Sequence, residues 1–136
     1  MTMQDEKKAL FIGRWQPFHN GHRWLVDKKL AEGTPCLVAV RDIPPDVKNP
    51  FTTKQTVLML QTVFSGENVD VIVIPDIESV NYGRGVGYEV NEHIPPKDVG
   101  FISATSIRDQ IKLGKDDWKK NVDPKIHDQI IQMMTY

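Results

Sequence analysis

The stretch Leu10-Phe11-Ile12-Gly13-Arg14-Trp15-Gln16-Pro17-Phe18-His19-Asn20-Gly21-His22 decides the fold of this chain. Its apolar beginning, residues 9–12, predicts a buried strand. Glycine and proline then interrupt any regular pattern, and a helical pattern follows over residues 21–32. His19 and His22 therefore lie where a predicted strand passes into a predicted helix.

Asn20 is the predicted N-cap of that helix, which places His22 and Arg23 in its first turn. The N-terminus of a helix carries positive potential and unpaired amides, so basic side chains are disfavoured there. Four basic groups near this turn become compatible if an anion, most simply a phosphate, fills the space: Arg14, His19, His22 and Arg23. The alternative interpretation is a plain loop with two surface histidines.

Composition limits the class of protein. The 136 residues suit one domain, spanning 1–136, with 40% apolar and 26% charged residues as in a globular protein. A net charge of −1 provides no global field for nucleic acid or membrane, so neither is expected as a partner. The single cysteine, Cys36, excludes an internal disulfide, and its apolar neighbours predict a small buried side chain. Residues 1–8 are too polar for a secretory signal, so a cytoplasmic location is expected.

The rest of the first half alternates strand and helix. Residues 36–40 and 69–74 are apolar runs that predict two more buried strands, and Thr52 with Gln55 forms a capping box that begins a second helix. This alternation predicts an α/β fold with a doubly wound parallel sheet. A further short strand is expected at residues 99–102, with C-terminal helices over about 105–134.

A second strand-to-helix turn is predicted at Ile102-Ser103-Ala104-Thr105-Ser106-Ile107-Arg108. Ser103, Thr105 and Ser106 are all N-cap types. Arg108 is expected in the first helical turn, where the helix dipole again opposes a cation. Both turns should open at the carboxyl edge of the sheet, where parallel sheets bind ligands.

Residues 81–88, Asn-Tyr-Gly-Arg-Gly-Val-Gly-Tyr, form the least regular part of the chain. Their glycine spacing is not that of the dinucleotide fingerprint. They fit either a flexible turn or a mobile flap over a ligand. For the flap we expect Tyr82 and Arg84 to bind the acceptor molecule, because aromatic rings stack on rings and arginine meets phosphate.

The first motif resembles the signature of the HxGH nucleotidylyltransferases. It looks closest to the archaeal-type nicotinamide mononucleotide adenylyltransferases, in a shortened form and with Trp15 where these have phenylalanine. The second motif is similar to their Ile-Ser-Gly-Thr-x-Ile-Arg, with Ala104 in place of glycine. The resemblance implies a Rossmann-like fold and transfer of a nucleoside monophosphate from ATP or CTP to a phosphorylated acceptor, with release of pyrophosphate.

The resemblance also implies roles for particular residues. His19 and His22 would contact the triphosphate and the migrating phosphate, and Arg108 would hold the β- and γ-phosphates. The other phosphate-binding candidates are Gly13, Arg14, Ser103, Thr105 and Lys48, of which Lys48 could equally be a solvated lysine. A Mg²⁺ ion would bridge the phosphates, held by substrate oxygens and water, with no dedicated protein ligands.

The acceptor and the nucleotide remain open at this point. The adenylyltransferases that the chain resembles have a longer region before the second motif, so a cytidylyltransferase acting on a small phosphorylated alcohol is an alternative. A non-catalytic nucleotide-binding protein of the same fold is another. Homo-oligomerisation is left open as well.

Overall fold

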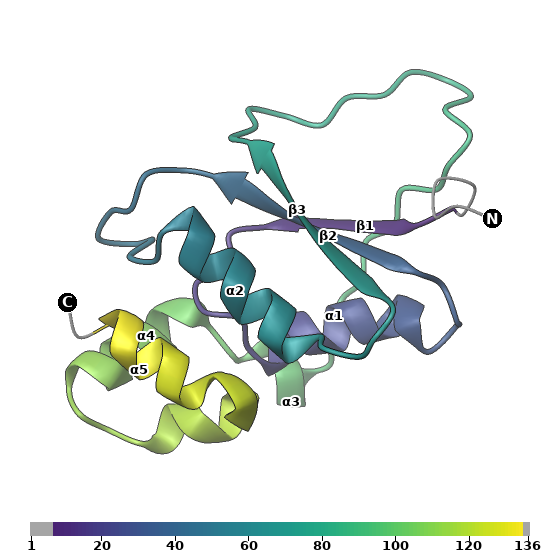
Figure 1. Ribbon diagram of the computed structural model, residues 1–136. Helices are drawn as coiled ribbons and strands as arrows, with labels where there is room; N and C mark the ends of the chain where they lie inside the picture. The colour runs from purple at the N-terminus through teal and green to yellow at the C-terminus, as the bar shows by residue number, and fades with distance from the viewer. Residues whose placement is uncertain (1–6, 135–136) are drawn as a thin grey trace.

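Three parallel strands form the sheet, in the order β1-β2-β3 (Figure 1). The computed structural model describes residues 7–134. β1 (Ala9–Gly13), β2 (Cys36–Asp42) and β3 (Val69–Pro75) are in register, with Phe11 beside Val38 and Val38 beside Val71. The predicted parallel α/β fold of Rossmann-like type is confirmed.

Two crossover helices connect the strands: α1 (Asn20–Leu30) follows β1 and α2 (Thr53–Val63) follows β2. Right-handed crossovers that progress in one direction place both helices on the same face of the sheet, as Figure 1 shows. That face forms the core, where apolar strand side chains pack on apolar helix side chains: Phe11, Val38, Val40, Val26, Met59 and Leu60 are all under a tenth exposed. Burial of each such side chain stabilises the fold by roughly 1.5–3 kcal/mol.

The position of a strand in the sheet decides how deeply it is buried. β2, in the centre, carries the most deeply buried strand residues, since Cys36, Val38 and Ala39 are fully buried. The edge strands are more open than predicted, since Leu10 of β1 is 55% exposed and Ile72 of β3 is 37% exposed. Periodicity alone did not distinguish the central strand from its neighbours.

The predicted capping box of α2 is confirmed. Thr52 accepts a hydrogen bond from the Gln55 amide at 3.0 Å, and Gln55 accepts one from the Thr52 amide at 2.9 Å. The apolar residues of α2 are not all buried: Leu58 is 54% exposed, whereas the adjacent Met59 is fully buried.

The strand predicted at residues 99–102 is also wrong. Residues 99 and 100 end a short helix, α3 (Lys97–Gly100), in which the Val99 and Gly100 amides both bond the Pro96 carbonyl at 3.0 and 2.7 Å, and residues 101 and 102 follow it outside any helix or strand. A four-residue apolar run fits a helical turn as well as a strand. Asp98 in the first turn complements the dipole of a helix.

The C-terminal part is helical. It consists of α4 (Ala104–Lys112), the 3₁₀ helices η2 (Asp117–Asn121) and η3 (Pro124–Ile126), and α5 (His127–Met134). These helices lie beside α2 rather than over the sheet (Figure 1). Asp123 caps η3, because its side chain accepts a hydrogen bond from the Lys125 amide at 2.9 Å. None of the helices in residues 7–134 is long and apolar enough to cross a membrane.

Residues 76–96 have no helix or strand, and in Figure 1 they arch away from the helices. The segment starts at the carboxyl end of β3, where Asp76 forms an ion pair of 2.6 Å with Arg41 of β2. Gly85 and Gly87 have φ angles of 73° and 80°, a region that favours glycine. The prediction of an irregular segment here is correct.

Candidate functional site

His19 and His22 together cap helix α1. His19, not the predicted Asn20, is the N-cap: its Nδ1 accepts hydrogen bonds from the Gly21 and His22 amides at 3.0 and 3.4 Å. His22 Nδ1 accepts in return from the His19 amide at 3.2 Å. This is a capping box in which two imidazoles occupy the N-cap and N3 positions, where most such boxes have Ser and Glu. Asn20 instead donates to the Lys120 carbonyl at 3.2 Å.

The capping bonds determine the protonation of both rings. Because each Nδ1 accepts a hydrogen bond, the neutral ring carries its proton on Nε2. The rings stack with centroids 3.7 Å apart. Burial lowers the pKa of His19 to about 4, and burial together with repulsion from His19 lowers the pKa of His22 to about 3. Both histidines are therefore neutral Nε2–H donors at pH 7.

Trp15 packs against His22 of this histidine pair. Its φ of 56° lies in the left-handed region, which is unusual for a bulky residue. The buried indole donates from Nε1 to the Ala39 carbonyl at 3.1 Å and meets the edge of the His22 ring with centroids 4.9 Å apart. It occupies the space beside Gly13, where a Cβ would come within 2.8 Å of the ring. Gly13 thus has a packing role in this turn.

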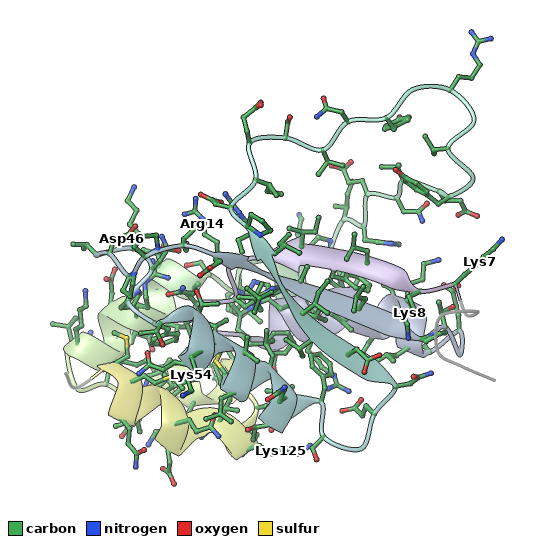
Figure 2. All side chains as sticks on the ribbon, turned by 45° about the horizontal axis from the view of Figure 1, so that its top comes forward. Lys7, Lys8, Arg14, Asp46, Lys54 and Lys125 are labelled. Atoms are coloured by element: carbon green, nitrogen blue, oxygen red, sulfur yellow. The ribbon has the colours of Figure 1, made fainter. Side chains whose placement is uncertain are left out.

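The loop after β2 contributes Lys48 and Asn49. Asp46 Oδ1 accepts hydrogen bonds from the Lys48 amide at 2.9 Å and from the Asn49 amide at 2.7 Å, which folds the loop into a tight turn. These hydrogen bonds lower the pKa of the Asp46 carboxyl, and the bonds from Asn49 contribute most to that shift. Figure 2 shows Asp46 and Arg14 at the same end of the molecule, far from Lys7 and Lys8.

Arg108 reaches the same region from α4. Since α4 begins at Ala104 with Ser103 as its N-cap, Arg108 lies in the second turn and not in the first as predicted. Its guanidinium donates to the Gln16 carbonyl at 2.6 Å and to Thr105 Oγ1 at 3.3 Å. Arg108 is 8% exposed, and burial lowers its pKa.

These parts surround a cavity of about 250 Å³, called the basic pocket below. Its lining consists of Arg14, Trp15, Gln16, His22, Lys48, Asn49, Ala104, Thr105 and Arg108. The lining therefore contains three permanent cations and no carboxylate. Among residues 7–134, none of the ion pairs involves Arg14, Lys48 or Arg108. Such a pocket is electrostatically complementary to an anion with several negative charges.

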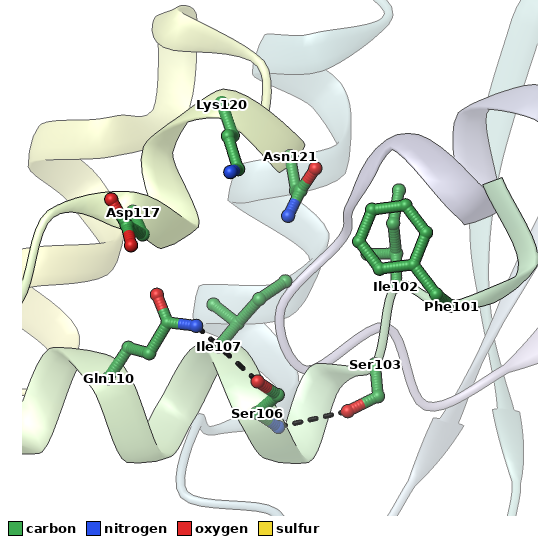
Figure 3. Close-up of a pocket in the computed structure, with 9 residues that line it drawn as sticks. All are labelled: Phe101, Ile102, Ser103, Ser106, Ile107, Gln110, Asp117, Lys120 and Asn121. Atoms are coloured by element: carbon green, nitrogen blue, oxygen red, sulfur yellow. Dashed lines mark hydrogen bonds between the residues drawn. The ribbon is translucent and has the colours of Figure 1, made fainter. Parts of the chain in front are cut away.

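Five predicted site residues thus meet in one place: Arg14, His22, Lys48, Thr105 and Arg108. His19 lies behind His22 rather than in the lining. The Ser103 hydroxyl accepts a hydrogen bond from the Ser106 amide at 3.0 Å and lines a second cavity of about 220 Å³, on the other face of α4 (Figure 3). The phosphate contacts predicted for His19, Gly13 and Ser103 stay predictions.

Arg23 does not belong to the site, contrary to prediction. Its guanidinium forms ion pairs with Asp27, at 3.0 Å, and with Glu67, and it lies 4.9 Å from the centroid of the Phe64 ring. The side chain joins α1 to the turn after α2. The basic residue in the first turn therefore finds its counterions within the protein.

Tyr82 and Arg84 line neither cavity. Both are exposed, on the segment that leaves β3. Their contact with an acceptor remains a prediction.

Sequence reasoning missed Trp15, Gln16 and Asn49 as pocket residues. All three are buried and uncharged. Trp15 and Gln16 bond backbone groups of distant segments, and the Asn49 side chain donates to the Asp46 carboxylate at 3.1 Å. Gln16 and Asn49 are nevertheless buried polar residues, and those almost always have a specific hydrogen-bonding task. The available signal was a polar residue directly before a proline, as in Gln16-Pro17 and Asn49-Pro50.

Residues 7–134 contain no cluster of three His, Cys, Asp or Glu side chains that could hold a metal ion. The lining of the basic pocket contains no carboxylate, the side chain by which proteins usually hold Mg²⁺.

Comparison with known proteins gives this site its context. The cytidylyltransferase-like family model matches residues 10–126. The chain is 32% identical over 99 residues to a nicotinamide-nucleotide adenylyltransferase of Methanocorpusculum labreanum, and 34% identical over 110 residues to one of Thermoplasma acidophilum. These alignments cover 71% and 79% of this chain but 58% and 62% of the relatives, so the chain spans about three-fifths of their length.

Among solved structures, a match is a bifunctional NMN adenylyltransferase/ADP ribose pyrophosphatase from Francisella tularensis, crystallised with AMP and a manganese ion. It is 28% identical, with a TM-score of 0.43, over 52% of this chain and 22% of that one. The family model covers both motifs and every residue of the basic pocket. The chain belongs to the cytidylyltransferase-like family.

Proposed function

We propose that this chain is a nucleotidylyltransferase that transfers a nucleoside monophosphate from ATP to a phosphorylated acceptor and releases pyrophosphate, with nicotinamide mononucleotide as the acceptor. The observation that carries the proposal is the basic pocket, in which three cations without ion-pair partners face one cavity. The names of the relatives support the choice of ATP and nicotinamide mononucleotide.

In this reaction an oxygen of the acceptor phosphate attacks the α-phosphorus of the triphosphate. The bond from the α-phosphorus to the oxygen bridging it to the β-phosphorus breaks, and pyrophosphate leaves with the electron pair. Positioning and charge stabilisation do most of the catalytic work in such transfers, and no strong base is needed. Arg14, Lys48 and Arg108 would bind the β- and γ-phosphates, where negative charge grows.

The histidines would act as neutral donors. His22 lines the basic pocket, and Nε2–H is the donor it has free because its Nδ1 is engaged in the cap. A fixed dipole aimed at charge that develops in the transition state lowers the barrier without reorganising. His19 would hold the orientation of His22 by stacking and add a donor of its own. The Mg²⁺ ion is part of the substrate complex and would neutralise phosphate charge.

We also propose that residues 1–136 work as a single nucleotidylyltransferase domain in the cytoplasm, and that Tyr82 and Arg84 bind the acceptor. The support for the acceptor site is positional. The segment that carries both residues leaves the carboxyl end of β3, the edge of the sheet at which β1 leads into the basic pocket.

The test is a pyrophosphate-release assay that crosses MgATP and MgCTP with nicotinamide mononucleotide and a small phosphorylated alcohol, glycerol 3-phosphate. We expect turnover with MgATP and nicotinamide mononucleotide. His22→Ala should lower kcat roughly a hundredfold while changing the KM for ATP much less. The family description makes the cytidylyltransferase the second candidate, and turnover only with MgCTP and the alcohol would support it. No release with any pair would overturn both.

A further inference from the structure

Gln16 joins parts of the basic pocket that are far apart in the sequence. Its side-chain Oε1 accepts a hydrogen bond from the Phe51 amide at 3.0 Å, and its Nε2 donates to the Phe51 carbonyl at 3.3 Å. Its own carbonyl accepts the 2.6 Å bond from Arg108, 92 residues further along the chain. Gln16 is 5% exposed and lines the pocket. One residue of the first motif thus contacts both the loop after β2 and α4.

The bonds of Gln16 differ in effect from those within the loop. The Asp46 bonds to Lys48 and Asn49 are internal to the turn, so they fix its shape. The Gln16 bonds cross from the first motif to Phe51, so they fix where that turn lies relative to Arg14 and His22. Phe51 is fully buried, so its backbone is held in place by the packing of its side chain in the core. Lys48 lies only three residues before it.

Only an amide side chain can make this pair of bonds, because it has a donor and an acceptor at its tip. Glutamate in place of Gln16 would keep the acceptor but lose the donor. Methionine would keep the size of the side chain but lose both the donor and the acceptor. A neutral side chain also leaves the charge of the pocket unchanged.

We propose that Gln16 is a positioning residue that holds Lys48 and Arg108 at the spacing that a triphosphate requires. This inference rests on the proposed function of the basic pocket. Gln16 acts through these two cations, and preorganising them removes the cost of ordering the loop when the ligand binds.

The chain provides a matched control in Gln55. Its Oε1 accepts a hydrogen bond from the amide of Thr52, the residue directly after Phe51, at 2.9 Å. Each glutamine therefore accepts a hydrogen bond from a backbone amide, and the two amides belong to consecutive residues. Gln55, however, lies outside the basic pocket. Gln55→Met measures the effect of losing such a bond on the local fold alone.

The experiment titrates magnesium tripolyphosphate and MgATP calorimetrically into five proteins: the wild type, Gln16→Met, Gln55→Met, Lys48→Ala and the double variant Gln16→Met with Lys48→Ala. We expect Gln16→Met to raise the Kd of both probes on the order of tenfold. Gln55→Met should change it less than about twofold. In the Gln16→Met background, Lys48→Ala should have a clearly smaller effect than in the wild type, because Lys48 has already lost its position.

This coupling distinguishes positioning from a merely structural role. Additive effects of Gln16→Met and Lys48→Ala, or equal losses in Gln16→Met and Gln55→Met, would overturn the inference while leaving the proposed function intact. A wild-type protein that binds neither probe would overturn the proposed function itself. If circular dichroism shows Gln16→Met to be unfolded, Gln16→Asn takes its place in the same cycle, since it keeps the pocket neutral and shortens the amide side chain by one methylene group.

Discussion

Two stacked imidazoles that cap a helix explain much of the chemistry at the scale of single residues. Their Nδ1 atoms are used by the backbone, so each ring keeps one donor in a fixed direction. Their lowered pKa values mean that the permanent positive charge of the pocket comes from Arg14, Lys48 and Arg108. In the proposed reaction the neutral donors would orient the substrate and the permanent cations would neutralise its charge.

The same pKa values predict how stability depends on pH. An exposed histidine in the unfolded chain has a pKa near 6.5, whereas His19 and His22 titrate at about 4 and about 3 in the folded protein. Below pH 6.5 the unfolded state therefore binds protons that the folded state does not, and the free energy of unfolding falls as the pH falls towards 4. At pH 5 the loss should be up to about 2 kcal/mol per ring relative to pH 8.

Urea denaturation between pH 8 and pH 4 measures this loss. His22→Gln keeps an acceptor for the cap but does not titrate, so it should remove roughly half of the pH dependence. Equal slopes in the wild type and the variant would show that the buried histidines do not control acid stability.

Local signals in the sequence identified most of this chemistry. The basic side chains, the histidine spacing and the capping types pointed to Arg14, His22, Thr105 and Arg108 of the basic pocket, and the resemblance to the HxGH nucleotidylyltransferases implied Lys48. The sequence could not show that Arg23 has Glu67 as a partner, because that contact joins positions 44 residues apart. Trp15 and Gln16 were missed because their partners are backbone groups of distant segments, and Asn49 was missed because it is uncharged and its partner is the Asp46 carboxylate of its own loop.

At the scale of elements, the sequence predicted each strand and helix that has a strong period or a clear cap. β1, β2, β3 and the beginning of α2 agree with the structure to within about two residues. The failure at residues 99–102 has a different cause. Four apolar residues do not distinguish a strand from a turn of helix, and tertiary surroundings decided between them.

The segment 76–96 yields the prediction at this scale. If it is the flap proposed for the acceptor, Arg84→Ala should raise the KM for the acceptor several-fold, because a cation that meets the acceptor phosphate is lost. The KM for the triphosphate should change little. Steady-state kinetics with each substrate varied in turn provide the measurement, and Lys54→Ala on the exposed side of α2 is a control. An unchanged KM for the acceptor would show that residues 76–96 only connect β3 to α3 and do not bind the acceptor.

At the scale of the whole molecule, three distant segments build one site. The turn after β1, the loop after β2 and the start of α4 meet at the basic pocket, and the parallel sheet brings the first two together at its carboxyl edge. That edge was predictable, because it follows from the order of strands and helices. The route by which residues 76–103 return to the carboxyl edge of the sheet was not predictable, because that part of the chain has no regular sequence pattern.

The central claim is that the basic pocket binds a nucleoside triphosphate through its cations. Calorimetric titration of MgATP and MgCTP into the wild type and into Arg14→Ala tests it most directly, because Arg14 is exposed and its removal leaves the core intact. We predict binding of at least one triphosphate at submillimolar concentration, weakened about tenfold or more in Arg14→Ala. Absence of binding at millimolar concentrations of both nucleotides, or equal affinity in the two proteins, would contradict the claim.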